Sequence, residues 1–394
     1  MKGDLALLGS VGVAMVAIPA AVLIWSGQFT VGMETLSPPV TLPVSAAASE
    51  GGDVPSQGGP AQTGEAGAAS ALSPEEGVAQ GADGVPTQGE GTLPDSVKER
   101  WVSPIDTLYI YDQGTGEVVD LSLSEYTRYA IAAEMSADYH LEALKAQGVA
   151  ALTYALFQAM EQRSLPEEER DPALHGADFA ADPGNNRGYM TEENAKAFYG
   201  ERFDYCWSKI TQAAQTACRC VALWEGEPIA AAYHAISAGE TTERAENIWL
   251  APLPYLVEVD SSWDILAPGY KSTVTVADGE LEELLTAAGA TLLPDPASWL
   301  EIEERSPAGY VTAIRAGSLT LHGNQLRNLL GLRSAAFELE RTYSGYTFYV
   351  RGYGHGAGLS QAGADYLARQ GWGFDEILRH YYTGITLAEV VTEG

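Results

Sequence analysis

Glu134 is the carboxylate in this sequence that is best placed for general acid catalysis. It follows a largely apolar run, residues 129–133, that predicts the end of a helix, so part of its surroundings should be hydrophobic. Such surroundings disfavour the charged form of a carboxylate and raise its pKa toward the range in which a general acid works. A solvated glutamate at a helix end is the alternative that the local residues leave open.

A second region combines four glycines with one histidine near the C-terminus. Residues 351–361 read Arg-Gly-Tyr-Gly-His-Gly-Ala-Gly-Leu-Ser-Gln, with His355 between the glycines. Glycines at this density allow a positive φ or a close approach of the backbone to a ligand. A phosphate-binding loop is not indicated, because no Lys-Ser or Lys-Thr pair follows. We expect Ser360 to cap the next helix, which leaves Gln361 in its first turn.

A third region, residues 233–239, follows an apolar strand and reads Tyr-His-Ala-Ile-Ser-Ala-Gly. A loop at a strand end with hydroxyl and imidazole groups can hydrogen-bond the hydroxyls of a sugar. The alternative is that Ser237 and Gly239 build a turn and that His234 satisfies a buried backbone group.

The three regions together resemble the stage II sporulation protein D family of cell-wall enzymes, over residues 105–387. The family pattern Glu-Met-Pro, followed by a Glu-Ala-Leu-Lys-Ala-Gln helix, matches residues 134–147, with Ser136 in place of the proline. The other two family patterns are Tyr-His followed by Ser-x-Gly, and Gly-x-Gly-His-Gly-x-Gly-Met-Ser-Gln. Leu359 replaces the methionine of the latter, and Leu152 stands where the family has an arginine.

This resemblance implies a lytic transglycosylase that cuts the β-1,4 bond between N-acetylmuramic acid and N-acetylglucosamine of peptidoglycan. Glu134 would be the catalytic acid, and the products would carry 1,6-anhydro ends. The implied substrate is a glycan strand already stripped of peptides by a partner amidase, within an engulfment complex of membrane proteins during sporulation. A non-catalytic wall-binding scaffold or amidase enhancer is the alternative, and a hydrolase that leaves free reducing ends is a third.

The resemblance also assigns the remaining site residues. Lys145 and Gln147 lie on the helix that follows Glu134, and with five residues of the other two regions they are expected to bind substrate: His234, Ser237, Gly239, His355 and Gln361. Some family members bind zinc through two histidines and two cysteines. Only His175 remains of that ligand set here, so we predict no metal and no cofactor.

The elements that must position these residues form an α+β pattern with more hairpins than strand-helix-strand units. Residues 101–394 are enough for two lobes, and the resemblance implies a central cleft beside Glu134. The second expected helix should carry one apolar stripe. Expected helices cover residues 123–133, 140–162, 205–216, 280–288, 323–330, 360–369 and 374–381, and expected strands cover residues 108–111, 117–121, 220–224, 229–233, 255–259, 272–276, 337–341 and 347–351.

Three segments divide the chain. Residues 5–25 carry no charged side chain, which is enough helix to cross a bilayer core, and residues 1–36 are therefore expected to be a single-pass anchor with the C-terminal part outside the cytoplasm. A cleaved signal peptide is the alternative. Residues 37–100, rich in Gly, Ala, Ser, Pro and Glu, are expected to be a disordered linker. Residues 101–394 would form the catalytic domain.

The net charge of −31, from 22 basic and 53 acidic residues, argues against a nucleic-acid partner and against long-range attraction of anionic wall polymers. A glycan would instead be held by hydrogen bonds and by stacking on aromatic rings. The three cysteines, Cys206, Cys218 and Cys220, cannot all pair within one chain, and we expect them to be small buried apolar residues.

Overall fold

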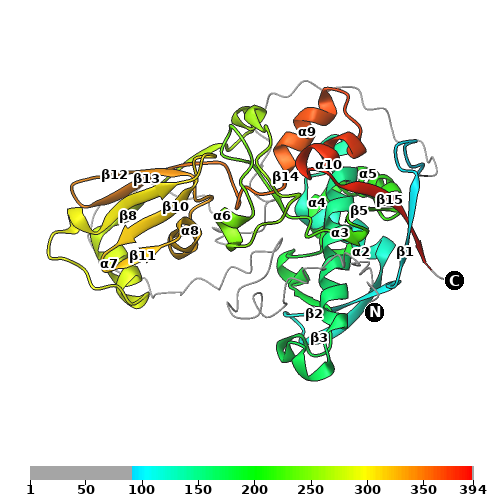
Figure 1. The fold of residues 1–394 in the computed structure, drawn as a ribbon, viewed down its shortest axis with the longest axis horizontal. Coiled ribbons are helices and arrows are strands. Elements are labelled where there is room, and N and C mark those ends of the chain that lie inside the picture. Colours follow the sequence, from blue (N-terminus) through cyan, green and yellow to red (C-terminus); the bar gives the residue numbers. More distant parts are fainter. Residues whose placement is uncertain (1–90, 393–394) are drawn as a thin grey trace, which may run out of the picture.

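A computed structural model describes residues 91–392. The expected anchor and most of the expected linker lie outside this range. Within it, no helix is both long enough and apolar enough to cross a membrane. The described chain forms two lobes, each with its own hydrophobic core (Figure 1).

The larger lobe is built around helix α3 (Leu141–Ser164), which packs against α2 (Leu123–Glu134), α5 (Phe203–Ala217), α9 (Gln361–Arg369) and α10 (Phe374–Tyr381). Every residue from 146 to 156 is buried. The helix is therefore covered all round, and the expectation of a single apolar stripe is wrong. Helices surround α3 on several sides, and its many alanines allow them to approach. A β-carbon on Gly148 would lie 2.7 Å from side-chain atoms of both Ile131 and Ala217.

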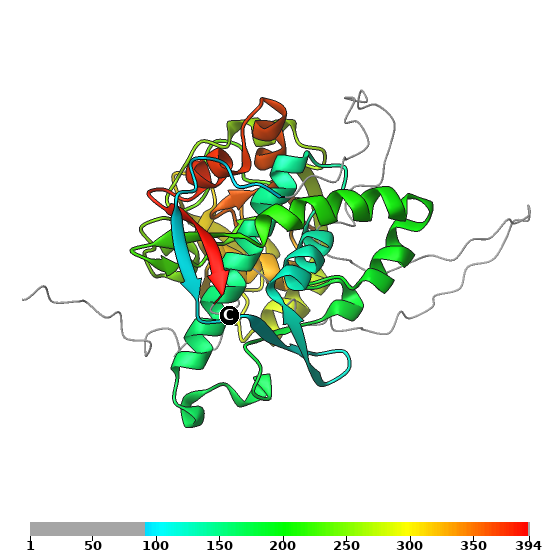
Figure 2. The ribbon, with the colours of Figure 1, turned by 90° about the vertical axis from the view of Figure 1, so that its right-hand side faces the viewer.

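Two sheets flank these helices. One has the order β1 (Glu99–Ser103), β15 (Thr386–Thr392), β5 (Cys220–Trp224), β6 (Glu227–Pro228), and its parallel β1–β15 pair joins the two ends of the described chain (Figure 2). The other has the order β3 (Glu117–Ser122), β2 (Thr107–Asp112), β4 (Phe179–Ala181). The expected hairpin of residues 108–121 is confirmed as β2–β3.

The smaller lobe comprises two three-stranded sheets with one helix each (Figure 1). Its core packs residues of both sheets and of both helices, and its expected helices, strand β8 and last hairpin are confirmed. Its elements are β8 (Lys271–Ala277), α7 (Asp278–Ala287), β9 (Leu300–Arg305), β10 (Val311–Ala316), β11 (Leu319–Leu321), α8 (Gly323–Leu330), β12 (Phe337–Arg341) and β13 (Gly345–Arg351).

Two expected strands are wrong. After the turn that follows β5, only the short β6 pairs with it. The Ile229 N–H still donates to the Ala222 carbonyl (3.1 Å), but residues 230–232 leave the sheet and are buried. Only Tyr233–His234 is extended, as β7, and it pairs in parallel with β14 (Leu359–Ser360). Residues 255–259 form a turn and an irregular segment rather than a strand, and Tyr255, Leu256 and Val259 pack in the larger core.

Two short helices complete the described chain, α4 (Glu192–Tyr199) and α6 (Glu246–Trp249). The cysteines are three free thiols. Cys206 and Cys220 are buried, as expected, whereas Cys218 at the end of α5 is partly exposed, which corrects the expectation for that residue.

Candidate active site

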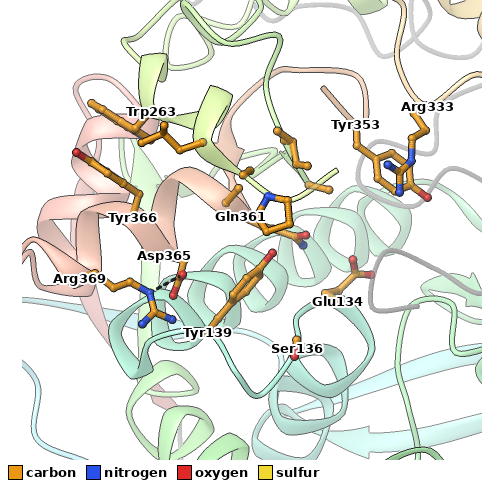
Figure 3. A pocket seen from close by; sticks show the side chains of 16 residues that line it. Glu134, Ser136, Tyr139, Trp263, Arg333, Tyr353, Gln361, Asp365, Tyr366 and Arg369 are labelled. Atoms are coloured by element: carbon orange, nitrogen blue, oxygen red, sulfur yellow. Dashed lines mark hydrogen bonds and ion pairs between the residues drawn. The ribbon is translucent and has the colours of Figure 1, made fainter. Parts of the chain in front are cut away.

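A pocket opens beside Glu134 in the larger lobe and reaches residues at the base of the smaller one (Figure 3). It contains about 870 Å³ of space, part of it open to solvent. Four aromatic side chains and several hydrogen-bonding groups form its wall. The lining residues are Glu134, Ser136, Tyr139, Ala235, Ile236, Trp263, Leu266, Ala267, Pro268, Arg333, Tyr353, Gln361, Ala362, Asp365, Tyr366 and Arg369.

Glu134 is the last residue of α2, and the helix is fixed at both ends. Ser122 and Glu125 form a capping box at its start, and the Met135 N–H donates to the Ile131 carbonyl at its end (3.0 Å). Three buried alanines precede Glu134, and burial raises its pKa to about 7, with a hydrogen bond from the Tyr233 hydroxyl acting in the opposite direction. The expected raised pKa is confirmed by this geometry.

Pairing of β7 with β14 brings two distant sequence regions to Glu134. Tyr233 lies opposite Leu359, and His234 lies opposite Ser360. Gln361, which follows immediately, therefore starts α9 at the pocket wall. Its Nε2 donates to the Oε1 of Gln147 on α3 (3.2 Å), so that Gln147 lies behind the pocket and supports Gln361 rather than lining the pocket itself.

Asp264 links the loop after β7 to the start of α9. Its buried carboxylate accepts hydrogen bonds from the Ser237 N–H (2.6 Å) and from the Ser360 hydroxyl (2.5 Å). Ser360 in turn caps α9 by accepting from the Gly363 N–H, as the sequence predicts. Ser237 is fully buried and is placed outside the pocket lining, where it joins the loop after β7 to the start of α9.

Substituting Asp264 with Ala should lower the free energy of unfolding by about 2–4 kcal/mol, because two buried donors would lose their acceptor. Asp264→Asn, which keeps one oxygen, should cost less. Urea unfolding of the two variants checks this order. The exposed neighbour Asp260, which accepts from the Ser262 N–H, is the matched control. If Asp260→Ala costs as much as Asp264→Ala, the proposed role of Asp264 is wrong.

His234 and His355 pack against each other behind the pocket, with ring centroids 5.8 Å apart. His234 Nδ1 lies 3.0 Å from the Ala357 carbonyl, and His355 Nδ1 accepts from the Ala357 N–H (3.1 Å). Burial lowers the pKa of each imidazole to about 3, so both are neutral near pH 7. Neither lines the pocket.

The two other expected binding residues also lie outside the lining. Lys145 pairs with Glu142 (2.6 Å), and the second oxygen of that glutamate accepts from the Phe374 N–H, so Lys145 belongs to the contact between α3 and α10. Gly239 has a φ of 108°, and a β-carbon there would lie 2.7 Å from the Ile265 side chain. It serves a tight turn. Leu152 lies in the core and is not one of the lining residues.

Four aromatic residues and three charged ones of the wall were not expected from the sequence. Asp365 and Arg369 follow Gln361 at steps of four on the same helix, and this spacing is the signal that could have found them. Tyr353 lies within the glycine-rich motif. The contribution of Tyr139, Trp263, Arg333 and Tyr366 depends on tertiary packing, with Trp263 and Tyr366 stacked at 5.6 Å.

Asp365 is a second carboxylate in the pocket, but its oxygens are already engaged. One accepts from the His140 N–H (2.6 Å) and the other from Arg369 Nε (2.8 Å). Glu134 is thus the lining carboxylate with a raised pKa. Within residues 91–392, no three His, Cys, Asp or Glu side chains are grouped so as to hold a metal ion.

The raised pKa of Glu134 gives a test that needs no substrate. A carboxyl whose folded-state pKa is raised contributes stability that is present below its unfolded pKa, near 4.5, and is lost as pH rises through about 7. Glu134→Gln should therefore be more stable than the parent chain by about 1–3 kcal/mol at pH 8 and nearly equal to it at pH 4.5.

Urea unfolding at both pH values measures this difference. Glu192→Gln is the control, because the ion pair with Lys196 lowers the pKa of Glu192 and this variant should gain no stability at pH 8. A difference between Glu134→Gln and the parent chain that does not change with pH would contradict the raised pKa.

Comparison with known proteins places the site in a family context. A family model described as "Stage II sporulation protein" matches residues 111–223, which include Glu134 and all of α3. Stage II sporulation protein D of Bacillus subtilis (strain 168) is 31% identical over 287 residues, 73% of this chain and 80% of the relative. The protein of the same name from Bacillus amyloliquefaciens has the same identity and coverage.

A more distant relative carries a different name. The "Amidase enhancer" of Bacillus subtilis (strain 168) is 26% identical over 308 residues, which cover 64% of this chain and 39% of the relative.

Proposed function

Because this chain belongs to the stage II sporulation protein D family, we propose that it is a lytic transglycosylase acting on the bond between N-acetylmuramic acid and N-acetylglucosamine of peptidoglycan. One observation carries the proposal: a single carboxyl with a pKa near 7 lies in a pocket walled by aromatic rings. Such a pocket suits a sugar chain, since rings stack on sugar faces while polar groups bind hydroxyls.

The reaction needs first an acid and then a base, and Glu134 can act as each in turn. As the acid it protonates the glycosidic oxygen while the bond from that oxygen to the muramyl anomeric carbon breaks. As the carboxylate it then accepts the proton of the muramyl 6-hydroxyl, whose oxygen bonds to the anomeric carbon and closes the 1,6-anhydro ring. The proton returns to Glu134, and no water is consumed. The hydrogen bond from Tyr233 orients the carboxyl and stabilises its charged form between these steps.

The wall offers groups for the sugars on both sides of the bond. Tyr139, Trp263, Tyr353 and Tyr366 provide ring faces or edges, and Ser136 and Gln361 provide hydrogen bonds (Figure 3). Gln361 is held by Gln147, so its amide is oriented before substrate arrives. Family members are expected to act on peptide-free strands, and we assign the same substrate class to this chain.

The setting of this activity is part of the proposal. We expect residues 5–25 to anchor the chain in the cell membrane, with the catalytic domain outside the cytoplasm, near a partner amidase and the membrane proteins of an engulfment complex. An amidase enhancer without lytic activity is the second candidate, favoured by the relative of that name.

Mass spectrometry of digested peptide-free strands separates the candidates. The full chain should release products with 1,6-anhydro ends. A hydrolase would release products heavier by one water. Binding of strands without any new ends would contradict the lytic proposal and favour the enhancer.

A further inference from the structure

Arg333 is the basic residue of the pocket wall whose charge is not paired. It lies beside Tyr353, with the guanidinium carbon 4.6 Å from the ring centroid (Figure 3). One nitrogen, Nη1, donates to the Gly269 carbonyl (3.1 Å). Among residues 91–392, no carboxylate forms an ion pair with it. Arg369, the other arginine of the wall, is instead paired with Asp365.

The position of Arg333 is unusual for this chain. With a net charge of −31, most of its arginines have acidic neighbours, and the protein as a whole repels anions. An arginine has five N–H donors, of which Arg333 uses one for Gly269. The ring of Tyr353 and the Gly269 carbonyl hold the guanidinium at the pocket wall, and Gly269 leaves its other N–H donors for a ligand. Such a group is preorganised for a carboxylate, which it can bind through two parallel hydrogen bonds.

On the sugar chain itself, peptidoglycan carries such a carboxylate in one chemical state only. Each muramyl residue carries a lactyl ether, and in the intact wall its carbonyl is an amide linked to the stem peptide, without charge. Hydrolysis of that amide consumes one water and leaves a free lactyl carboxylate. A peptide-free strand is therefore an anionic polymer with one carboxylate on every second sugar.

We propose that Arg333 binds this lactyl carboxylate and thereby selects peptide-free strands at the pocket. The inference rests on the function proposed above and adds the residue that distinguishes the substrate from its precursor. In this complex the guanidinium of Arg333 and the lactyl carboxylate balance each other's charge.

The test compares two substrates with the full chain. One is the peptide-free strand, and the other is the same strand with its lactyl carboxylates converted to methylamides. The parent chain should prefer the former. Arg333→Gln should raise KM for the peptide-free strand about 10- to 100-fold, with a small change in kcat, and should affect the methylamide strand far less. Arg333→Lys should retain part of the preference, because it keeps the charge but not the two-pronged geometry.

Arg100→Gln is the matched control. It removes an exposed arginine of β1 that does not line the pocket, and it should change neither rate. Equal losses of Arg333→Gln on both strands would mean that Arg333 only supports the loop at Gly269 and would overturn the proposal. An undiminished preference in Arg333→Gln would overturn it as well.

Failure of the lytic function gives a different pattern. If the parent chain makes no 1,6-anhydro ends from either strand, calorimetric binding of the two strands still tests Arg333. Weaker binding of the peptide-free strand by Arg333→Gln alone would support the carboxylate contact while the lytic proposal fails. Equal binding of both strands by the parent chain would overturn the carboxylate contact.

Discussion

Glu134→Gln should reduce the release of 1,6-anhydro ends from peptide-free strands by about 10³-fold or more. Glutamine has nearly the same shape as the protonated acid, so binding should persist, but it has no proton to give to the leaving oxygen and cannot take one from the 6-hydroxyl. No other lining carboxylate can substitute, because Asp365 is engaged by Arg369 and by the His140 N–H. Product analysis by mass spectrometry, at equal protein and strand concentrations, measures the loss.

Two further variants sharpen this result. Glu192→Gln removes an exposed acid on α4 that pairs with Lys196, and it should leave the rate unchanged. Asp365→Asn tests for a paired-carboxylate hydrolysis, in which a second carboxylate activates water. If Asp365 were that second carboxylate, the products of the parent chain would carry free reducing ends. Retained lytic activity in Glu134→Gln would refute the assignment of Glu134.

Gly358→Ala should lower the free energy of unfolding by about 3 kcal/mol or more, which is the largest loss of stability that we expect from adding one carbon atom. Gly358 has a φ of 69°, a left-handed conformation that costs an alanine about 1–2 kcal/mol. Its new β-carbon would also collide with the Ala232 carbonyl oxygen and lie 3.1 Å from the Tyr382 ring. The parallel pairing of β7 with β14, which positions Tyr233, would have to shift.

Thermal unfolding of this variant should show a midpoint lower by roughly 6–10 °C, together with a loss of activity. Gly279→Ala is the control, because Gly279 lies in α7 with no positive φ and with nothing within 4 Å of an added β-carbon. That variant should be neutral or slightly more stable. Equal effects of the two substitutions would show that the close approach at Gly358 does not limit stability.

Of the two roles that the composition of the glycine-rich motif allows, positive φ or close approach to a ligand, the structure bears out the first. Gly352, Gly354, Gly356 and Gly358 all have positive φ, and none of them lines the pocket. A β-carbon on Gly354 would lie 2.7 Å from the His234 side chain, and one on Gly356 would collide with the Tyr310 hydroxyl. The motif is a packing device that holds α9, and with it Gln361, against the loop after β7.

The sequence predicted secondary structure correctly where residues close together in the chain determine it. Helices α2, α7, α8, α9 and α10 begin and end near the predicted residues, because caps, glycines and apolar spacing act within a few residues. Strands β1, β4, β9, β10 and β15 were not predicted. β1 and β15 pair across almost the whole described chain, and no local pattern encodes a partner nearly three hundred residues away.

The sequence by itself indicated Glu134 as the candidate acid, the apolar residues before it and the family of the chain, since each depends on neighbouring residues or on motifs read in order. It also indicated Gln361 at the start of a helix. The tertiary structure alone decided which motif residues reach the pocket: it placed His234, Ser237 and His355 behind the wall and brought Trp263, Arg333 and Tyr366 into it. The physical reason is that burial and charge pairing depend on elements packed from distant parts of the chain, whereas helix ends and turns depend on adjacent residues.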